Sequence, residues 1–175
     1  ASGPTMPART TALDALSIIE RFRVPIAEPI IECFRQNVAL PSPDAPCFEK
    51  ADFRIIATGS HALSAAAALA REAGCEVSIV GDELEASALD LAISHARMAR
   101  SHTNPGVPRI ILSGGEATVA LGENHGAGGP NQEFVLALAL ELQGEHNVHA
   151  LACDTDGIDG GSGDANDPAG AVISS

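Results

Sequence analysis

Apolar residues recur every three or four positions in two stretches near the start of the chain, residues 11–23 and 28–38. This spacing places the apolar side chains on one face of an α-helix. The apolar positions are Leu13, Leu16, Ile18, Ile19, Phe22, Ile30, Ile31 and Phe34. Pro29 suits the first turn of the second stretch, because that turn needs no intrahelical backbone donor. The pattern therefore predicts two helices.

Behind a turn-rich linker at residues 41–46, short apolar runs alternate with helical patterns. The apolar runs predict strands at residues 53–57, 76–80, 109–112, 117–121 and 148–153. The helical patterns predict helices at residues 60–72, 85–100 and 131–143. The last of these is almost entirely apolar after its first turn, so we expect it to be covered on most sides. The alternation predicts an α/β fold, a layered sheet with flanking helices, whose ligands gather at the carboxyl ends of parallel strands.

Composition narrows the class of protein. The 175 residues include 10 Lys and Arg against 23 Asp and Glu, a formal charge of -13. This balance argues against binding to nucleic acid, which requires a cationic face on the protein. It also argues against binding to an anionic membrane surface. No apolar stretch reaches the roughly 18 residues of a membrane helix. The cysteines show no zinc spacing, which favours reduced thiols and a cytoplasmic location; they are Cys33, Cys47, Cys75 and Cys153.

The charge is distributed unevenly along the chain. Residues 110–175 hold ten acids and no Lys or Arg, and twelve of the 17 glycines lie at or after Gly114. The acids of this part cannot pair with local cations, so those near a pocket must be solvated, bind a metal, or meet basic groups from elsewhere. A break at residues 102–108 marks the shift in composition and predicts a domain boundary at residue 107. The second part is predicted to form the site.

The first candidate motif is Ser113-Gly114-Gly115-Glu116, which directly follows a predicted strand. Adjacent glycines at a strand end let successive N–H groups turn toward one anion and hold a phosphate without a cation. The alternative is a tight turn between two strands, which the tetrapeptide alone favours.

The second candidate is the glycine-rich stretch from Gly126 to Gly129, which leads through Pro130 into Asn131-Gln132-Glu133. A helix N-terminus offers unpaired N–H donors and a positive dipole end, so it can bind an anion. Pro130 and Glu133 are equally typical of an ordinary first helical turn. Both interpretations stay open.

The third candidate is Asp154-Thr155-Asp156-Gly157-Ile158-Asp159-Gly160, after a predicted buried strand. Three acids in six residues without a local cation favour a hard cation such as Mg²⁺, whose shell is completed by water and phosphate oxygens. The spacing does not match an EF-hand. The alternative is a solvated loop of Asp and Gly.

Several familiar motifs are missing from the sequence. The only lysine is Lys50, and there is no G-x-x-x-x-G-K-[ST], no G-x-G-x-x-G and no G-x-S-x-G. The histidines show no metal-ligand spacing; they are His61, His95, His102, His125, His146 and His149. The sequence thus gives no support for a P-loop, a Rossmann nicotinamide site or a hydrolase elbow within these residues.

Taken together and in this order, the three motifs resemble those of the class II glycerate kinases, many of which have been labelled hydroxypyruvate reductases of tartrate degradation. Residues 1–5 resemble another motif of that family, and His61-Ala62-Leu63 lies where members carry a similar helix start. Pro130 departs from the family pattern, because many members carry Arg there. Members are also much longer, so the chain resembles an internal fragment.

The resemblance implies that residues 1–107 are the last part of a large Rossmann-like domain and residues 108–175 the first part of a leucine-rich domain. It implies ATP-dependent phosphorylation of D-glycerate to 2-phosphoglycerate, with Mg²⁺ and no nucleic-acid or membrane partner; a homodimer stays open. The family's catalytic lysine is expected before residue 1, so the isolated 175-residue chain is expected to be inactive.

The resemblance also implies roles for individual residues. Those expected to contact ATP or its phosphates are Ser2, Gly3, Thr5, Ser113, Gly114, Gly115, Glu116, Gly128 and Gly129. Those expected to contact substrate or nucleotide are Asn131, Gln132 and Glu133, with Glu133 also counted as catalytic. Those expected to hold Mg²⁺ or activate the hydroxyl group are Asp154, Asp156 and Asp159. The alternatives are an NAD(P)H-dependent hydroxypyruvate reductase, a phosphotransferase with Asp154 as nucleophile, and a non-catalytic nucleotide- or metal-binding module.

Overall fold

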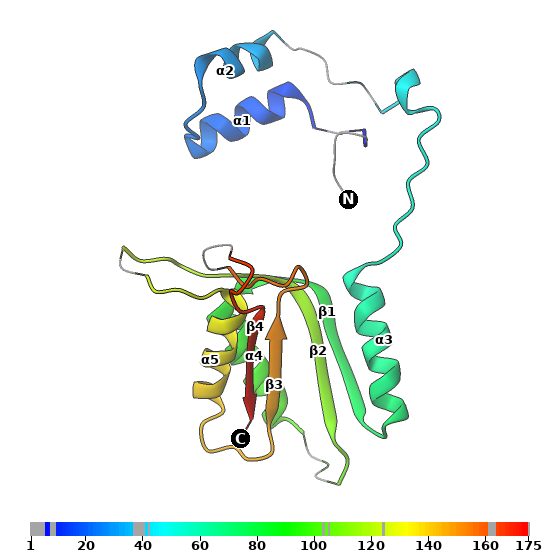
Figure 1. The fold of residues 1–175 in the computed structure, drawn as a ribbon, viewed down its shortest axis with the longest axis vertical. Coiled ribbons are helices and arrows are strands. Elements are labelled where there is room, and N and C mark those ends of the chain that lie inside the picture. Colours follow the sequence, from blue (N-terminus) through cyan, green and yellow to red (C-terminus); the bar gives the residue numbers. More distant parts are fainter. Residues whose placement is uncertain are drawn as a thin grey trace. The chain divides into compact units, whose positions relative to one another are not determined.

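The structure is a computed structural model that describes residues 6–7, 10–36, 41, 43–102, 104, 106–123, 125–160 and 164–174. The chain divides into two compact units, Ala1–Ile55 and Ile56–Ser175 (Figure 1). No helix among the described residues has both the length and the apolar character needed to cross a membrane.

The first unit contains two α-helices, α1 (Ala12–Phe22) and α2 (Glu28–Arg35), and a short 3-10 helix, η1 (Pro46–Phe48). Thr11 and Asp14 form a capping box at the start of α1, in which each side chain accepts a hydrogen bond from the other's backbone N–H. Both helices confirm the prediction made from the apolar spacing. The predicted end of the second helix at residue 38 lies outside the described residues, and α2 ends at Arg35.

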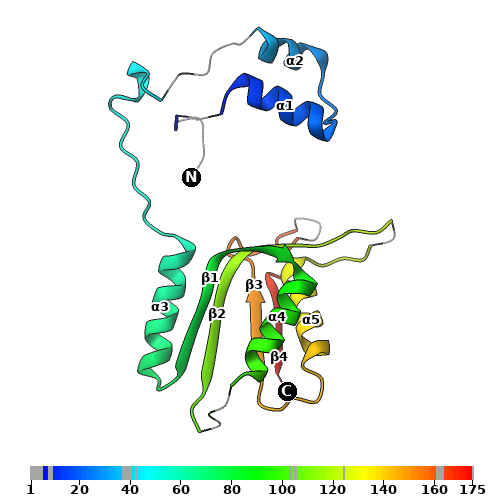
Figure 2. The same cartoon turned by 180° about the vertical axis from the view of Figure 1, so that it is seen from behind.

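The second unit alternates helices and strands: α3 (Gly59–Glu72), β1 (Glu76–Ser87), α4 (Ala88–Arg100), β2 (Arg109–Thr118), α5 (Pro130–Glu141), β3 (His149–Cys153) and β4 (Gly170–Ser174). β1 and β2 pair in parallel, with α4 as the crossover, and β3 pairs with β4 in the antiparallel sense. Figures 1 and 2 show α3 beside β1 on one side of the unit and α5 on the other. The predicted mixed α/β fold with a parallel sheet and flanking helices is confirmed.

The core of this unit lies between α4 and α5. Ala92 and Ala96 of α4 are fully buried and pack with Leu138 of α5 and with Leu142 at its C-cap. Small side chains on α4 let α5 approach closely, while the larger leucines of α5 supply the apolar area that leaves water. Ile173 of β4 packs on the same cluster. The crossover helix therefore ties the parallel pair to α5, and α5 in turn packs on the second pair of strands.

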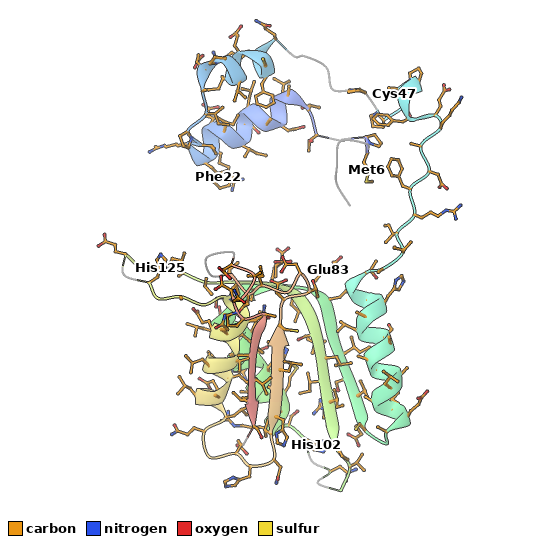
Figure 3. All side chains as sticks on the ribbon, viewed as in Figure 1. Met6, Phe22, Cys47, Glu83, His102 and His125 are labelled. Atoms are coloured by element: carbon orange, nitrogen blue, oxygen red, sulfur yellow. The ribbon has the colours of Figure 1, made fainter. Side chains whose placement is uncertain are left out.

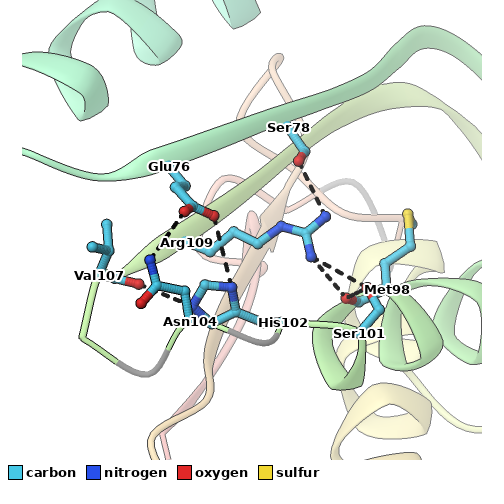
Figure 4. Close-up of polar contacts among 8 residues, drawn as sticks. All are labelled: Glu76, Ser78, Met98, Ser101, His102, Asn104, Val107 and Arg109. Atoms are coloured by element: carbon cyan, nitrogen blue, oxygen red, sulfur yellow. Dashed lines mark hydrogen bonds and ion pairs between the residues drawn. The ribbon is translucent and has the colours of Figure 1, made fainter.

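Arg109 fixes the end of the unit at which β2 begins. Its guanidinium donates to the carbonyl of Met98 at 3.3 Å and to the hydroxyls of Ser101 at 3.2 Å and Ser78 at 3.1 Å (Figure 4). These contacts join the last turn of α4 to both parallel strands. Figure 3 shows His102 at this end of the unit and Glu83 at the opposite end, where β1 and β2 finish.

Four of the five predicted strands differ from the structure in existence or by more than one residue in extent. Residues 53–57 form no strand and are exposed, with Ile56 at 90% relative exposure, because no other described segment pairs with them. The two strands predicted at 109–112 and 117–121 form one strand, β2. Its partner β1 also runs to Ser87, so α4 starts at Ala88, three residues after the predicted start, with the Ser87 side chain capping its first turn.

The prediction that the helix at residues 131–143 is covered on most sides is also wrong for the described residues. α5 buries Val135 and Leu138 but leaves Leu136 63% and Leu140 66% exposed. One face of α5 packs on α4, β3 and β4, and no described element covers the other. The sequence did not predict β4, because the strand Gly170–Ser174 has only two large apolar residues and follows a loop rich in Asp, Asn and Pro.

Candidate functional site

Three of the predicted motifs lie toward the same end of the second unit. β2 carries Ser113 to Glu116 in its second half, α5 begins at Pro130, and the Asp154–Gly160 loop follows β3. In Figure 1 the arrow of β3 and the start of α5 both point to this end, the end at which Figure 3 labels Glu83. Only the Asp154–Gly160 loop directly follows a strand, while Ser113 to Glu116 lie within β2, so the gathering of site residues at strand ends stays a prediction.

Asp159 is the structural centre of this end. Its side chain is 1% exposed, and its carboxylate accepts four hydrogen bonds from the first turn of α5. Oδ1 accepts from the backbone N and from Nδ2 of Asn131, both at 2.9 Å. Oδ2 accepts from the backbone N of Gln132 at 2.8 Å and from its Nε2 at 3.1 Å. Two N–H groups that no helical carbonyl can reach are satisfied in this way.

The hydrogen bonds keep Asp159 charged although it is buried. Burial disfavours the carboxylate and by itself raises the pKa of Asp159, but the N–H groups of Asn131 and Gln132 favour the charged form and hold the pKa below its ordinary value. The positive end of the α5 dipole adds to this preference. Asp159, a buried acid in the part of the chain without Lys or Arg, is therefore stabilised by N–H groups of amides. It needs neither water, nor a metal ion, nor a basic side chain for this.

The glycines before α5 let the two loops touch through their backbones. A Cβ on Gly129 would lie 1.9 Å from the carbonyl oxygen of Asp159, and one on Gly160 would lie 3.0 Å from the carbonyl oxygen of Gly128. Gly160 also has a φ of +70°, which favours glycine. Packing against the Asp159 loop thus explains the glycine at position 129. The anion at this helix N-terminus is the chain's own carboxylate.

Glu133 lies in the same first turn of α5. It is half-buried, and its backbone N–H donates to the carbonyl of Gly129 at 3.0 Å. The structure brings Glu133, Asn131 and Gln132 together with Asp159. Their roles toward a substrate or nucleotide stay predictions.

The other two acids of the loop stabilise its turns. Asp154 Oδ1 accepts from the backbone N of Asp156 at 3.3 Å, and Asp156 Oδ1 accepts from the backbone N of Ile158 at 3.1 Å. Within the described ranges, no group of three or more His, Cys, Asp or Glu side chains is placed to hold a metal ion. Asp159 turns toward α5, so the structure does not gather the three predicted Mg²⁺ ligands, and magnesium binding stays a prediction.

Ser113-Gly114-Gly115-Glu116 lies inside β2, so the tight turn favoured by the tetrapeptide is wrong. Ser113 is opposite Gly81 of β1 and Gly115 is opposite Leu84, with irregular register on both sides of Gly81. Gly115 has a φ of +144°, and a Cβ there would lie 2.1 Å from the carbonyl oxygen of Leu84. Gly115 therefore serves a close approach of two parallel strands. The expected phosphate contacts stay predictions.

His95 of α4 is a site residue that the sequence analysis missed. Its Nε2 lies 2.9 Å from Oγ of Ser113, and its Nδ1 lies 2.8 Å from the carbonyl oxygen of Leu91. The ring meets Phe134 of α5 edge-on, with centroids 5.3 Å apart and planes at 87°. Spacing between histidines could not reveal it. The available signal was a polar side chain on the alanine face of α4, next to Ala92 and Ala96.

Some predicted residues are not placed by the structure. Ser2, Gly3 and Thr5 lie outside the described residues.

A surface hollow of about 450 Å³ lies near the other end of α5, lined by residues that include Gln143, Glu145 and Ser174. It contains none of the predicted site residues and is open to solvent, so we do not connect it with the motifs.

Comparison with known proteins identifies the second part of the chain. Residues 109–175 match the model of the MOFRL family. A relative in Agrobacterium vitis, named "Putative hydroxypyruvate reductase", is 41% identical over 99% of this chain and 39% of its own length. A relative in Thermotoga maritima, named "D-glycerate 2-kinase", is 27% identical over 99% of this chain and 40% of its own length.

A solved structure shares the fold. The crystal structure of a glycerate kinase from Thermotoga maritima superposes with a TM-score of 0.68 and 25% identity, covering 96% of this chain and 39% of that chain. The resemblance to the glycerate kinase family is therefore confirmed. The chain spans about 40% of the length of these relatives, as the shares of 39% and 40% show.

Proposed function

We propose that the MOFRL-containing chain is part of an ATP-dependent glycerate 2-kinase that transfers the γ-phosphoryl group to D-glycerate and forms 2-phosphoglycerate. The observation that carries the proposal is the match to the Thermotoga maritima relative named "D-glycerate 2-kinase" over 99% of this chain, together with the shared fold. Such a transfer depends on positioning the reactants and on stabilising charge. The described site offers residues for both tasks.

Asp159 orients the two amides at the start of α5. Because a carboxylate can only accept hydrogen bonds, Nδ2 of Asn131 and Nε2 of Gln132 must point toward it. The amide oxygens of both residues then remain as acceptors at the end of the unit where the motifs lie. Amide oxygens accept well from hydroxyl groups, which D-glycerate and the ribose of ATP both carry. We assign Asn131 and Gln132 to hydroxyl binding and Glu133 of the same turn to the reacting hydroxyl.

Asp154 and Asp156 are the acids that fit Mg²⁺ in this proposal. Asp156 is exposed and Asp154 is half-buried, and Mg²⁺ typically binds one or two carboxylates while water and substrate phosphates complete its shell. The ion would neutralise charge on the phosphates. Asp159 is the weaker candidate, since Asn131 and Gln132 occupy both of its oxygens.

The domain arrangement belongs to the same proposal. Residues 1–107 would end a large Rossmann-like domain and residues 108–175 would open the leucine-rich second domain. The catalytic lysine would then come from a part of the protein outside these 175 residues. Ser113 to Glu116 and Gly128–Gly129 would contribute backbone contacts to ATP.

Phosphorus NMR of the full-length protein with Mg-ATP and D-glycerate tests the activity. We expect ADP and a new 2-phosphoglycerate resonance, and a matched sample without D-glycerate should keep its ATP. Unchanged ATP with D-glycerate present would overturn the proposal. The isolated 175-residue chain should show no turnover, and turnover by that chain would contradict the assignment of the lysine.

A reductase is the second candidate, because the Agrobacterium vitis relative carries the name "Putative hydroxypyruvate reductase". Oxidation of NADH or NADPH that depends on hydroxypyruvate would favour it. The chain itself has no G-x-G-x-x-G, so the nicotinamide site would have to lie outside these residues. Binding of Mg-ATP without turnover of any hydroxy acid would instead favour a non-catalytic binding module.

A further inference from the structure

The contact between His95 and Ser113 has a defined direction. The Leu91 carbonyl, 2.8 Å from Nδ1 of His95, can only accept a hydrogen bond, so Nδ1 carries a hydrogen. A neutral imidazole has one N–H, which leaves Nε2 as an acceptor. Nε2 lies 2.9 Å from Oγ of Ser113. With a neutral His95 ring, the Ser113 hydroxyl therefore donates a hydrogen bond to Nε2 of His95.

This direction decides what Ser113 can offer a ligand. A hydroxyl has one hydrogen to donate and two lone pairs to accept with. Once the hydrogen is directed at Nε2, Oγ presents only lone pairs. A phosphate oxygen needs a donor, so it gains little from this hydroxyl, whereas a ligand hydroxyl can donate to it.

The surroundings hold the ring in this orientation. His95 is half-buried, and its edge contact with Phe134 restricts rotation of the ring between α4 and α5. Phe134 follows directly after the first turn of α5, where the side-chain amides of Asn131 and Gln132 donate to Asp159. Ser113 of β2 is thus linked through His95 to the same end of the unit.

We propose that His95 is a positioning residue that makes Ser113 an acceptor for a hydroxyl group of the bound small molecule. This inference rests on the proposed kinase function for its kinetic test. Two hydroxyl groups share the required chemistry, that of D-glycerate and that of the ATP ribose. The inference changes the role of Ser113 from the expected phosphate contact to a hydroxyl contact.

Steady-state kinetics of the full-length protein separates these roles. We compare Ser113→Ala, His95→Leu and His95→Gln with the His102→Gln control at the opposite end of the unit. Ser113→Ala and His95→Leu should raise the KM for one hydroxyl-bearing ligand about two- to tenfold with little change in kcat, as the loss of one hydrogen bond predicts. His95→Gln should recover most of the loss, because the glutamine amide oxygen can accept a hydrogen bond from the Ser113 hydroxyl.

The choice of ligand identifies the hydroxyl group. A raised KM for D-glycerate assigns the acceptor acid, and a raised KM for ATP that is absent with 2′,3′-dideoxy-ATP assigns the ribose. An equal rise with ATP and dideoxy-ATP would show a phosphate contact and overturn the inference. Unchanged KM values in both Ser113→Ala and His95→Leu would overturn it as well.

A spectroscopic readout does not depend on turnover. Long-range ¹H–¹⁵N spectra of the imidazole should show His95 as the tautomer with hydrogen on Nδ1 near neutral pH. A His95 ring with hydrogen on Nε2 would overturn the inference even in an active kinase. The protein could be inactive and still show the expected tautomer, with a His95 Nε2 signal that shifts when D-glycerate or ATP is added. That result would refute the kinase function and retain the acceptor role of Ser113. No such shift in an inactive protein would refute both.

Discussion

Asp159 stabilises the start of α5 as a charged group, so removing its charge should destabilise the second unit. In Asp159→Asn the new side-chain amide faces the N–H donors of Asn131 and Gln132, and one pair of donors loses its acceptor. Hydrogen bonds to charged groups contribute about 1.5–3 kcal/mol each, and we expect a loss of about 3 kcal/mol in the free energy of unfolding. Urea denaturation followed by circular dichroism measures it.

The control for this variant is Asp156→Asn, whose parent side chain is exposed and accepts one backbone hydrogen bond. It should change the free energy of unfolding by less than about 1 kcal/mol. Equal losses in the two variants would contradict the role of Asp159.

The same carboxylate makes stability depend on pH. Because the pKa of Asp159 is lower in the folded chain than in the unfolded one, its stabilisation is complete above about pH 4 and is lost as pH falls through the lower folded value. The difference in unfolding free energy between the wild type and Asp159→Asn should therefore be constant near pH 7 and shrink below about pH 4. A difference that grows on acidification would show the opposite sign of the pKa shift.

Gly129 is required for space and not for its backbone conformation. Its φ of -148° is open to any residue, but a Cβ would lie 2.3 Å from the carbonyl carbon of Asp159. Gly129→Ala should separate α5 from the Asp159 loop and cost about 1–3 kcal/mol, as in other overpacked sites. Gly126→Ala is the matched control, since a Cβ there meets nothing within 4 Å. Thermal unfolding of both variants makes the comparison, and equal midpoints would contradict the close packing.

At the level of secondary-structure elements, the pairing of β1 with β2 depends on one of two adjacent glycines. Gly115 has a φ of +144° and lies against the backbone of Leu84, while a Cβ on Gly114 would meet Cα of Asp82 at an ordinary 3.6 Å. Gly115→Ala should cost about 1–3 kcal/mol through strain and overlap, and Gly114→Ala should cost less than about 1 kcal/mol. Hydrogen exchange of the β1 and β2 amides should increase only in Gly115→Ala. Faster exchange in both variants alike would contradict this difference.

The elements that the sequence predicts well are those with local signals. Helix α1 has a capping box and apolar spacing within its own residues, and α5 starts at the predicted Pro130. The continuous β2 was missed because Ser-Gly-Gly-Glu resembles a turn unless β1 is known to lie beside it. The role of Asp159 was missed for the same reason, since its partners Asn131 and Gln132 are 28 and 27 residues away in the chain. Sequence distance separates the correct predictions from the wrong ones.

At the level of the whole molecule, basic residues before residue 110 partly compensate the negative charge of residues 110–175. Arg100 of α4 donates to Oε1 of Glu145 at 3.1 Å and also to the carbonyl oxygen of Glu141 at the end of α5. Both partners are half exposed, so this ion pair contributes little stability by itself. It joins α4 to α5 at the end opposite Asp159. Arg100 therefore holds the C-terminal end of α5, and the buried carboxylate of Asp159 holds its N-terminal end.

The division of the chain at residue 55 leaves an accessible connection between the two units. Residues 49–57 are exposed and belong to no helix or strand, and they include Lys50 and Arg54. A protease needs an extended backbone, whereas Arg71 and Arg97 lie in helices α3 and α4. Limited trypsin digestion of the full-length protein should therefore cut first after Lys50 or Arg54.

Mass spectrometry of the first fragments tests this expectation, with Lys50→Gln/Arg54→Gln as the control that should delay digestion severalfold. The digestion also compares the structural division at residue 55 with the boundary predicted at residue 107. First cuts after Arg100 or Arg109 would favour the boundary at residue 107, but Arg109 donates three hydrogen bonds that hold β2 to β1 and α4. Because those bonds and the α4–α5 core must open before trypsin can bind there, cleavage at residues 50–54 should precede it.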